Sequence, residues 1–399
     1  MLFRQQYGKA KGINELIAAP SDFHTGGALL FNERGPDGGF MRQIIVKYFD
    51  PGNDSGEPIS ELQILDALRG AERLFTFRSS GSESLGNALI LEYIGHGTLH
   101  ASILRFLEKR RRIPERLIWG VFLCLTRACV AMRYPAGLPQ GALLYRELMP
   151  APGQTGPINI QHNDMHLENI LIGDTNMYDM EHRFSPQTKL IDFGYARTHA
   201  VIPALENLQL AGPGMAPGGQ NNPAEDTPSS QKNIYDVATN IQDLATMLRV
   251  VHTYSQLVTV NTGPNNSAVI MTDAGVTVLQ AAPITDTLRH LLFRCLAKNA
   301  ADRPPLREVV QICERQVYYM NEWSYRNLPA EAWVYETDHA IWDALNDIVL
   351  NADYYEEYQR LAFGRRRSAA GLEGVEKGRH VPEMGDPRDD QPRNLSARF

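Results

Sequence analysis

Short apolar runs separated by turn residues occupy the first quarter of the chain. Two of them cover residues 28–31 and 40–49, and the turn-forming sequence Gly-Pro-Asp-Gly-Gly at 35–39 lies between them. Two further apolar runs follow at 74–77 and 88–94. Short apolar runs bounded by Gly, Pro and Asp are typical of β-strands joined by tight turns. The pattern therefore predicts a small antiparallel sheet.

A helical pattern interrupts these strands after residue 57. Pro58 lies where the first turn would be, and Ile64, Leu65 and Leu68 recur at a spacing that places them on one face. Proline is favoured in the first turn because its missing N–H would have no helical partner there. We therefore expect one amphipathic helix beside the sheet.

Longer helical patterns dominate the remainder of the chain. Residues 99–107 are amphipathic, residues 115–132 are apolar almost all round, and residues 234–251 form a third long pattern. A helix that is apolar on all sides is expected at the centre of a helical domain. Residues 323–361 carry aromatic and aliphatic side chains at helical spacing and predict another helix packed on this domain. Residues 258–281 are mixed and predict no defined element.

Two polar segments interrupt the helical domain. Residues 135–157 are rich in Pro and Gly, and residues 174–187 lengthen a predicted hairpin. Segments of this kind are expected at the surface. The last residues combine charge with Gly and Pro, which predicts disorder. We therefore divide the chain into a sheet domain, a helical domain, a helical extension and a disordered tail, at 1–92, 93–320, 321–363 and 364–399.

Composition and charge exclude several classes of protein. The 399 residues are 43% hydrophobic and 21% charged, which is ordinary for a globular protein. The net charge of −7 argues against nucleic-acid binding through overall positive charge. No apolar run approaches the roughly 18 residues of a membrane span, and the first residues lack the apolar core of a signal peptide. We expect a cytoplasmic or nuclear protein with neither nucleic-acid nor membrane partners.

The positions of the cysteines are those expected of a protein in a reducing compartment. They lie in apolar, helix-like segments and lack the spacing of a metal site. The four residues are Cys124, Cys129, Cys295 and Cys313. We expect them to be buried thiols.

Four residues of metal-binding types alternate along the segment 162–168. On a β-strand, alternate residues share one face, and His, Asp and Glu on one face are able to hold a metal ion. The four residues are His162, Asp164, His166 and Glu168. The sequence that follows favours a different chemistry.

A hairpin pattern comes directly after this segment. Apolar runs at 169–172 and 189–191 enclose a polar connector, and the second run ends in Asp192-Phe193-Gly194. Asp164 thus precedes an amide, Asn169, by five residues, and a second carboxylate, Asp192, follows the hairpin. Carboxylate, amide and carboxylate in this order are the arrangement of phosphoryl transfer. The chain here resembles the catalytic loop and the magnesium-binding motif of the protein kinase superfamily.

The resemblance implies an α+β fold with two lobes, a small antiparallel sheet lobe and a larger, mainly helical lobe. It implies ATP and Mg²⁺ as cofactors. Asp164 would orient the acceptor hydroxyl and take its proton, while Asn169 and Asp192 would hold the metal, which prefers oxygen ligands. Catalysis of phosphoryl transfer is mostly positioning and charge neutralisation. His162 and Phe193 would pack internally and align these groups.

The same resemblance assigns roles in the sheet domain. Lys47 closes the apolar run 44–46 and would contact the α- and β-phosphates, with Glu61 of the following helix as its carboxylate partner. Leu91 would lie at the back of the nucleotide pocket. Backbone groups from Glu92 to Ile94 would contact adenine.

The chain departs from the kinase pattern at three places. Residues 18–27 lack the glycine-rich sequence that lets backbone N–H groups approach phosphates. Asn163 replaces the arginine that pairs with an activation-loop phosphate, which predicts independence from that switch. His166 replaces a lysine, and a neutral imidazole would donate a single hydrogen bond to a phosphate oxygen.

His166 also supports an alternative. The sequence Asp164-x-His166-x-x-Asn169 resembles the loop of aminoglycoside and choline phosphotransferases. The end of the helical domain, in contrast, resembles the late helices of protein kinases, where Arg303 would pair with a glutamate, here Glu225. Asp236 fits the helix aspartate that braces the backbone of the catalytic loop in protein kinases.

We therefore expect an ATP- and Mg²⁺-dependent kinase that phosphorylates Ser or Thr hydroxyls of a protein substrate. The missing glycine-rich loop leaves open a pseudokinase that acts as a binding scaffold. A small-molecule phosphotransferase is the third hypothesis. The sequence does not indicate the oligomeric state.

Overall fold

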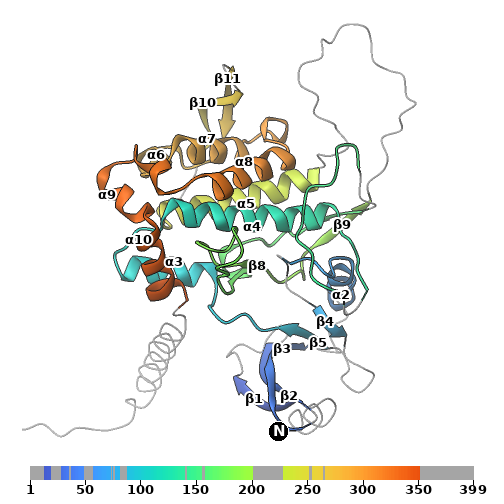
Figure 1. The fold of residues 1–399 in the computed structure, drawn as a ribbon. Coiled ribbons are helices and arrows are strands. Elements are labelled where there is room, and N and C mark those ends of the chain that lie inside the picture. The colour runs from blue at the N-terminus through green and yellow to red at the C-terminus, as the bar shows by residue number, and fades with distance from the viewer. Residues whose placement is uncertain are drawn as a thin grey trace, which may run out of the picture. The chain divides into compact units, whose positions relative to one another are not determined.

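A five-stranded antiparallel sheet forms the first part of the chain (Figure 1). The strand order is β1-β2-β3-β5-β4. The strands are β1 (Ile13–Ala18), β2 (Ala28–Arg34), β3 (Phe40–Tyr48), β4 (Phe77–Ser80) and β5 (Ala88–Glu92). The sheet confirms the strands predicted at 28–31, 40–49 and 88–94. Strand β4 shares only Phe77 with the predicted run 74–77, and β1 was not predicted.

The central strand β3 has two different faces. Ile44 and Val46 are buried, whereas Ile45 and Lys47 are partly exposed, as expected when alternate side chains point to opposite faces. β3 pairs with β2 on one side and β5 on the other, which places Lys47 opposite Ala28 and Leu89. Lys47 is therefore held at a fixed position between two strands.

Helix α2 (Glu57–Ala67) follows the sheet strand β3, as predicted from its helical period. Its buried side chains include Glu61, Ile64 and Leu65, and Leu68 is buried directly after the helix. A carboxylate thus lies among apolar residues, which is costly unless the carboxylate has a partner.

This computed structural model describes the residues of Met1–Ala352 in several ranges, and all of them belong to one compact unit. The second unit, Asp353–Phe399, lies outside the described residues, as does the predicted tail. The described ranges are 13–18, 28–35, 37–48, 57–72, 74, 77–80, 88–139, 142–154, 158–200, 228–250, 254–263 and 266–350.

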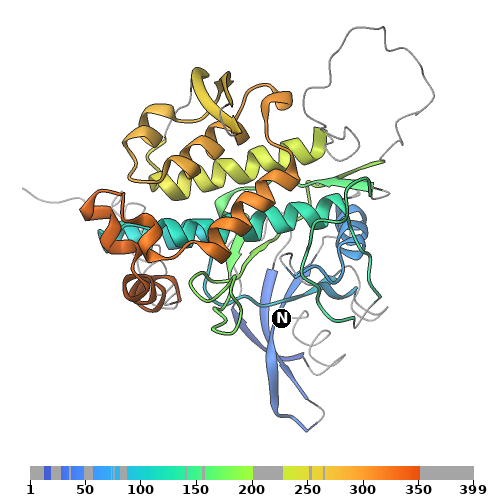
Figure 2. The same cartoon turned by 45° about the horizontal axis from the view of Figure 1, so that its top comes forward.

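Helices α4 (Glu115–Arg133) and α5 (Pro228–Thr246) form the centre of the helical part, residues 93–350. They lie side by side in Figures 1 and 2, and α8 (Leu306–Tyr319) packs on α4. Nearly every residue of α4 is buried, as its uniformly apolar sequence predicted. Helices α3 (Leu99–Glu108), α6 (Val276–Ala281) and α7 (Asp286–Cys295) also belong to this part.

Three small antiparallel pairs of strands complete the α+β architecture. They are β6 (Ile158–Gln161) with β9 (Arg197–Ala200), β7 (Ile170–Ile172) with β8 (Thr188–Leu190), and β10 (Gln256–Gly263) with β11 (Asn266–Thr272). The β7–β8 pair confirms the predicted hairpin. The β10–β11 pair and α6 account for the segment 258–281, for which the sequence predicted no element.

The prediction of one helix over residues 323–361 is wrong for the described residues. The chain forms a series of short helices instead, because Pro329 and Thr337 each precede a new helix and the Thr337 side chain caps its helix. The elements are η3 (Glu322–Tyr325), α9 (Ala330–Trp333), η4 (Val334–Glu336), α10 (Asp338–Ala344) and η5 (Leu345–Val349). Residues beyond 350 lie outside the description.

A buried carboxylate of the extension binds the start of α4. Glu336 accepts hydrogen bonds from the backbone N–H groups of Glu115, at 2.6 Å, and Arg116, at 3.1 Å. These N–H groups lie at the start of α4 and have no partner within the helix. Burial raises the pKa of Glu336 to about 7.

The segment 174–187 is more than the surface loop that the sequence predicted. Its Glu181 and His182 are buried, and Glu181 pairs with the fully buried Arg127 of α4 at 2.5 Å and 3.1 Å. Arg146 of the other insertion binds Asp179 at 2.6 Å. The two insertions are therefore joined to each other and to α4.

All four cysteines are buried thiols that form no disulfide bond, as predicted. Within the described residues, no helix combines the length and the apolar character needed to cross a membrane.

Candidate active site

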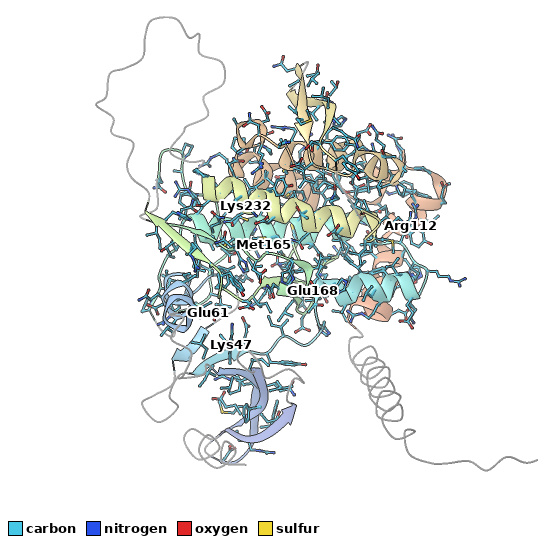
Figure 3. All side chains as sticks on the ribbon, turned by 180° about the vertical axis from the view of Figure 1, so that it is seen from behind. Lys47, Glu61, Arg112, Met165, Glu168 and Lys232 are labelled. Carbon is cyan, nitrogen blue, oxygen red and sulfur yellow. The ribbon has the colours of Figure 1, made fainter. Side chains whose placement is uncertain are left out.

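Lys47 joins the sheet to the segment that contains Asp192. Its Nζ donates to both carboxylate oxygens of Glu61 at 2.9 Å and to Oδ1 of Asp192 at 2.9 Å. Figure 3 shows Lys47 and Glu61 close together. Burial works to lower the pKa of Lys47, but the two carboxylates outweigh it and raise that pKa above its usual value. Lys47 is therefore a fixed positive charge at neutral pH.

Asp192 takes an unusual backbone conformation two residues after strand β8 ends. Its φ is +61°, in the left-handed region that few residues other than Gly, Asn and Asp adopt. Burial works to raise the pKa of Asp192, but Lys47 opposes it and lowers that pKa below the usual value. The side chain remains 42% exposed. Asp192 is thus an ionised carboxylate that is both paired and open to water.

His162 is a buried residue that links the segment of Asp164 to the segment of Asp192. It is buried, its Nε2 donates to the carbonyl of Ile191 at 3.0 Å, and its Nδ1 accepts from the N–H of Asp164 at 3.3 Å. Its ring meets the edge of Phe193 with centroids 4.7 Å apart. Burial lowers the pKa of His162 to about 4, so the ring is neutral at pH 7. His162 therefore aligns Asp164 with the segment that carries Asp192.

Asn169 holds the carboxylate of Asp164. Its Nδ2 donates to Oδ2 of Asp164 at 3.0 Å and to the carbonyl oxygen of the same residue at 2.9 Å. The amide nitrogen thus faces Asp164, which leaves the amide oxygen Oδ1 as the group suited to a cation. Asp164 and Asn169 come together because the short helix η1 (Leu167–Asn169) turns the chain between them.

His166 is engaged at both ring nitrogens. Nδ1 lies 2.8 Å from Oε2 of Glu168, and Nε2 lies 3.0 Å from Nδ2 of Asn169. Donation from His166 to a phosphate would require one of these contacts to break. The ring therefore braces Asn169 in this structure.

The backbone of residues 160–165 is held by two asparagines of α5. Asn233 accepts from the N–H of His162 at 3.2 Å and donates to the carbonyl of Ile160 at 2.8 Å. Asn240 donates to the carbonyl of Met165 at 3.0 Å. Both asparagines are buried.

The prediction that Asp236 performs this role is wrong. Its Oδ1 pairs with Lys232 on the same helix, and its buried Oδ2 has no partner among the described residues. The sequence signal for the true braces is weak, because a buried asparagine on a helix resembles many polar helix positions. Asn233 precedes Asp236 by three residues and lies on the adjacent turn of the same helix.

The predicted nucleotide-contacting residues lie around the end of β5. Leu91 is buried and pairs with Ile45 and Phe77 across the sheet. The side chain of Glu92 accepts from Nζ of Lys189 at 2.7 Å. Lys189 belongs to β8, so this ion pair, which the sequence did not predict, links the sheet to the strand that precedes Asp192.

The chain after Glu92 continues this connection. His96 donates its backbone N–H to the carbonyl of Ile172 at 3.2 Å, and Ile172 donates to the carbonyl of Gly97 at 2.9 Å. The added Cβ of a residue at Gly173 would lie 3.9 Å from Ile94. Ile94 therefore lies beside the β7–β8 hairpin; its contact with adenine remains a prediction.

The alternative metal site at 162–168 gains no support. This segment is not a strand, since only residues up to Gln161 belong to β6 and η1 follows at Leu167. Within the described ranges no group of three or more His, Cys, Asp or Glu side chains is placed to hold a metal ion.

Two predicted features lie partly or wholly outside the described residues. The segment that would cover the phosphates, at 19–27, is one of them, and the proposed Arg303 partner Glu225 is the other. Arg303 itself donates to the carbonyls of Gln231 at 3.1 Å and Ala297 at 2.9 Å, and its guanidinium lies 4.6 Å from the ring centre of Tyr235. Arg303 therefore packs against the start of α5.

Comparison with models of protein families gives no match for this chain, and comparison with curated proteins gives none either.

Proposed function

We propose that this chain is an ATP- and Mg²⁺-dependent phosphotransferase with a two-lobed, protein kinase-like fold, acting on Ser or Thr hydroxyls of a protein. The observation that carries the proposal is the position of Lys47. It bonds Glu61 on one side and Asp192 on the other, and Asp192 lies 145 residues further along the chain. A cation held between a buried and a half-open carboxylate is suited to bind phosphates.

The fold supports the same proposal. A five-stranded antiparallel sheet with one helix supplies Lys47 and Glu61, and the helical part supplies the remaining groups. Asp192 is presented by the β7–β8 hairpin and Asp164 by the turn before it. Lys47 thus bonds one carboxylate from each part, Glu61 and Asp192, which supports a phosphate-binding role for it.

The donor set fits Mg²⁺. This ion prefers oxygen ligands, keeps several waters and is usually held by one or two protein carboxylates together with substrate phosphates. Asp192 offers an exposed, ionised carboxylate and Asn169 an amide oxygen. Bound ATP with Mg²⁺ would supply the transferable phosphoryl group and neutralise its developing charge.

The chain's own residues would perform three tasks. Lys47 would bind phosphate oxygens and, through Glu61, keep a fixed position. Asp164, oriented by Asn169, would accept the proton of the acceptor hydroxyl. His162, neutral and buried, would keep Asp164 aligned with the Asp192 segment.

A small-molecule acceptor is the second candidate, favoured by the sequence Asp164-x-His166-x-x-Asn169. The position of Arg303 favours a protein acceptor instead, because its contacts with Gln231 and Tyr235 join the late helices to the start of α5. The two classes of acceptor differ in the substrate that receives phosphate, which an assay is able to distinguish.

The first test is nucleotide binding by thermal unfolding with and without Mg·ATP. Nucleotide at ten times its dissociation constant should stabilise the wild-type protein by about 1.4 kcal/mol. Asp192→Asn removes a ligand charge and should abolish most of this stabilisation. Asp302→Asn, an exposed aspartate elsewhere in the helical part, should leave it unchanged.

The second test is transfer of radiolabelled phosphate to peptide mixtures, amino alcohols and aminoglycosides. We expect labelled Ser or Thr peptides, with Asp164→Asn at least about 100-fold slower because general base catalysis is lost. Label in the small molecules alone would reassign the acceptor. Nucleotide binding without transfer to any acceptor would favour a scaffold, and transfer that survives Asp192→Asn would refute the metal role.

A further inference from the structure

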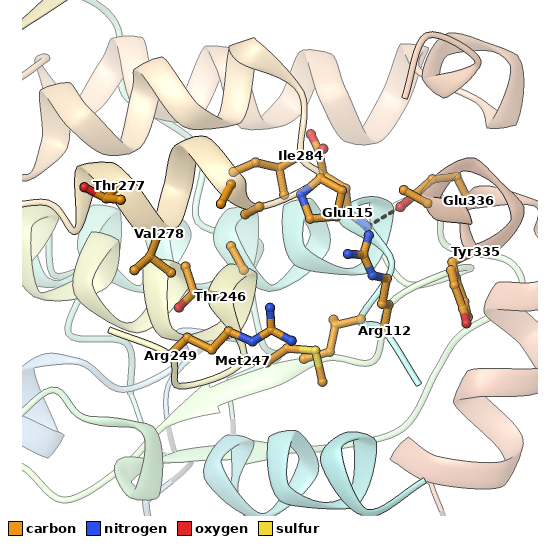
Figure 4. Close-up of a pocket in the computed structure, with 16 residues that line it drawn as sticks. Arg112, Glu115, Thr246, Met247, Arg249, Thr277, Val278, Ile284, Tyr335 and Glu336 are labelled. Carbon is orange, nitrogen blue, oxygen red and sulfur yellow. Dashed lines mark hydrogen bonds between the residues drawn. The ribbon is translucent and has the colours of Figure 1, made fainter. Parts of the chain in front are cut away.

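A cavity of about 300 Å³ lies within the helical part and shares no residue with the candidate active site (Figure 4). Its walls come from the start of α4, the end of α5, helix α6 and the segment that contains η4. This volume lies at the lower end of the range of small-molecule sites. The cavity is therefore large enough for a small ligand.

Most of the cavity wall is apolar. Ile113 and Ile284 are buried, and Met247, Val278 and Tyr335 line the space between them. An apolar lining with a few polar groups is typical of sites that bind organic molecules. These residues would enclose the apolar body of a ligand.

Two arginines give the cavity a positive end. Figure 4 shows the guanidinium groups of Arg112 and Arg249 directed toward the same space. Nη1 of Arg112 is buried and has no hydrogen-bond partner among the described residues. A buried donor without an acceptor costs about 1–3 kcal/mol. An anion in the cavity would supply the missing acceptor.

The two carboxylates of the cavity wall are already bound to other groups. Glu115 accepts from the N–H of Thr285 at 2.6 Å and from the indole N–H of Trp119 at 2.9 Å. Glu336 accepts from the first backbone N–H groups of α4. Burial raises the pKa of both carboxyl groups. Neither one forms an ion pair with Arg112 or Arg249 in the structure.

The backbone next to Arg249 is strained. Met247 and Leu248 have φ values of 53° and 59°, two consecutive left-handed residues that are not glycine. This conformation costs roughly 1–2 kcal/mol per residue and persists only where the surroundings impose it. It ends α5 abruptly, and Arg249 follows at once on the cavity wall.

We propose that this cavity binds a small organic monoanion, a carboxylate with an apolar body, whose head lies between Arg112 and Arg249. Arginine binds carboxylates through two parallel N–H···O bonds, and two arginines strengthen this preference. A single negative charge suits the site better than a phosphate dianion, because Glu115 and Glu336 lie in the same wall. The site is independent of the proposed phosphoryl transfer.

Octanoate and octanol form a matched pair of probes, since they share the apolar body and differ in the carboxylate. Isothermal titration calorimetry of the full chain should show octanoate binding about tenfold more tightly than octanol. Arg112→Gln and Arg249→Gln should each weaken octanoate binding by about tenfold and leave octanol binding unchanged. Unchanged octanol binding also shows that the cavity is intact in these variants.

Two further variants separate the head-group effect from occupation of the cavity. Val278→Trp fills the apolar space and should abolish binding of both probes. Arg326→Gln changes an exposed arginine outside the cavity and should alter neither. Equal affinity for octanoate and octanol, no octanoate binding to the wild type, or octanoate affinity unchanged by Arg112→Gln would each overturn the proposal.

Discussion

Two clusters of ion pairs in this protein differ in their access to water. The side chains of Arg127 and Glu181 are 0% and 1% exposed. In the cluster around Lys47, the lysine side chain is 24% exposed and Asp192 is 42% exposed. Both clusters join segments far apart in the sequence.

The partners of the two cations explain the difference. Arg127 is surrounded by acceptors of the protein itself: Glu181, Glu314, the carbonyl of Glu147 and the hydroxyl of Tyr318. Lys47 faces two carboxylates, of which one is open to solvent. A closed cluster has no place for a ligand and serves the fold, whereas an open cluster keeps charge available for binding.

The largest effect should come from the closed cluster. Arg127→Met leaves Glu181 buried without its main partner, and breaking a buried ion pair in this way costs about 3–5 kcal/mol. Urea unfolding followed by circular dichroism measures the loss. The double variant Arg127→Met/Glu181→Leu should recover part of it, because the unpaired buried charge is gone. A loss below about 1 kcal/mol would mean that the cluster contributes little to stability.

An effect of intermediate size should come from His162, which lies beside the open cluster. Its pKa is about 4 in the folded protein and about 6.5 when unfolded, so the unfolded state binds the proton more tightly. The stability due to neutral His162 is fully present above pH 6.5 and is lost as the pH falls toward 4. The contribution of His162 to the free energy of unfolding falls by about 3 kcal/mol over this pH range.

His162→Gln tests this pH dependence, since glutamine does not titrate. Urea unfolding at pH 7 and pH 4.5 should show that the wild type loses more stability on acidification than the variant. An equal loss in both proteins would show that His162 does not carry the acid sensitivity. The variant lacks the hydrogen bonds of His162 at both pH values, so their loss does not affect the difference in stability between pH 7 and pH 4.5.

The smallest effect on stability should come from the open cluster. Lys47→Met should cost about 1–2 kcal/mol, because Glu61 is able to take up a proton and Asp192 is partly hydrated. Stabilisation by Mg·ATP, in contrast, should disappear in this variant. A stability loss as large as that of Arg127→Met, with nucleotide binding intact, would remove the distinction between the two clusters.

The sequence predicted those parts of the site that depend on local pattern. The strand that carries Lys47, the helix of Glu61 and the hairpin between Asn169 and Asp192 each follow from short apolar periods and turn residues. The structure brings Lys47 within 2.9 Å of both carboxylates, a distance that no local pattern reveals. The kinase resemblance led to this pairing because it specifies which distant residues meet.

The features that the sequence did not predict depend on long-range packing or on competing local signals. Asn233 and Asn240 brace the backbone of residues 160–165 because α5 packs against β6, and nothing near them in sequence indicates that contact. Arg127 and Glu181 pair between a helix and an insertion. The broken extension was visible in the sequence, since Pro329 and Thr337 are helix-start residues, but the apolar spacing across them outweighed that signal.

Because the four thiols are buried, their chemical reactivity measures how often the helical part opens. Burial raises the pKa of Cys295 to about 12 and also raises the pKa values of Cys129 and Cys313, while Cys124 is buried in α4. Alkylating reagents attack the thiolate, so a folded chain should react slowly and each transient opening should leave a permanent mass label. Because the sheet contains no cysteine, the label would record motions of α4, α7 and α8 while the sheet stays silent.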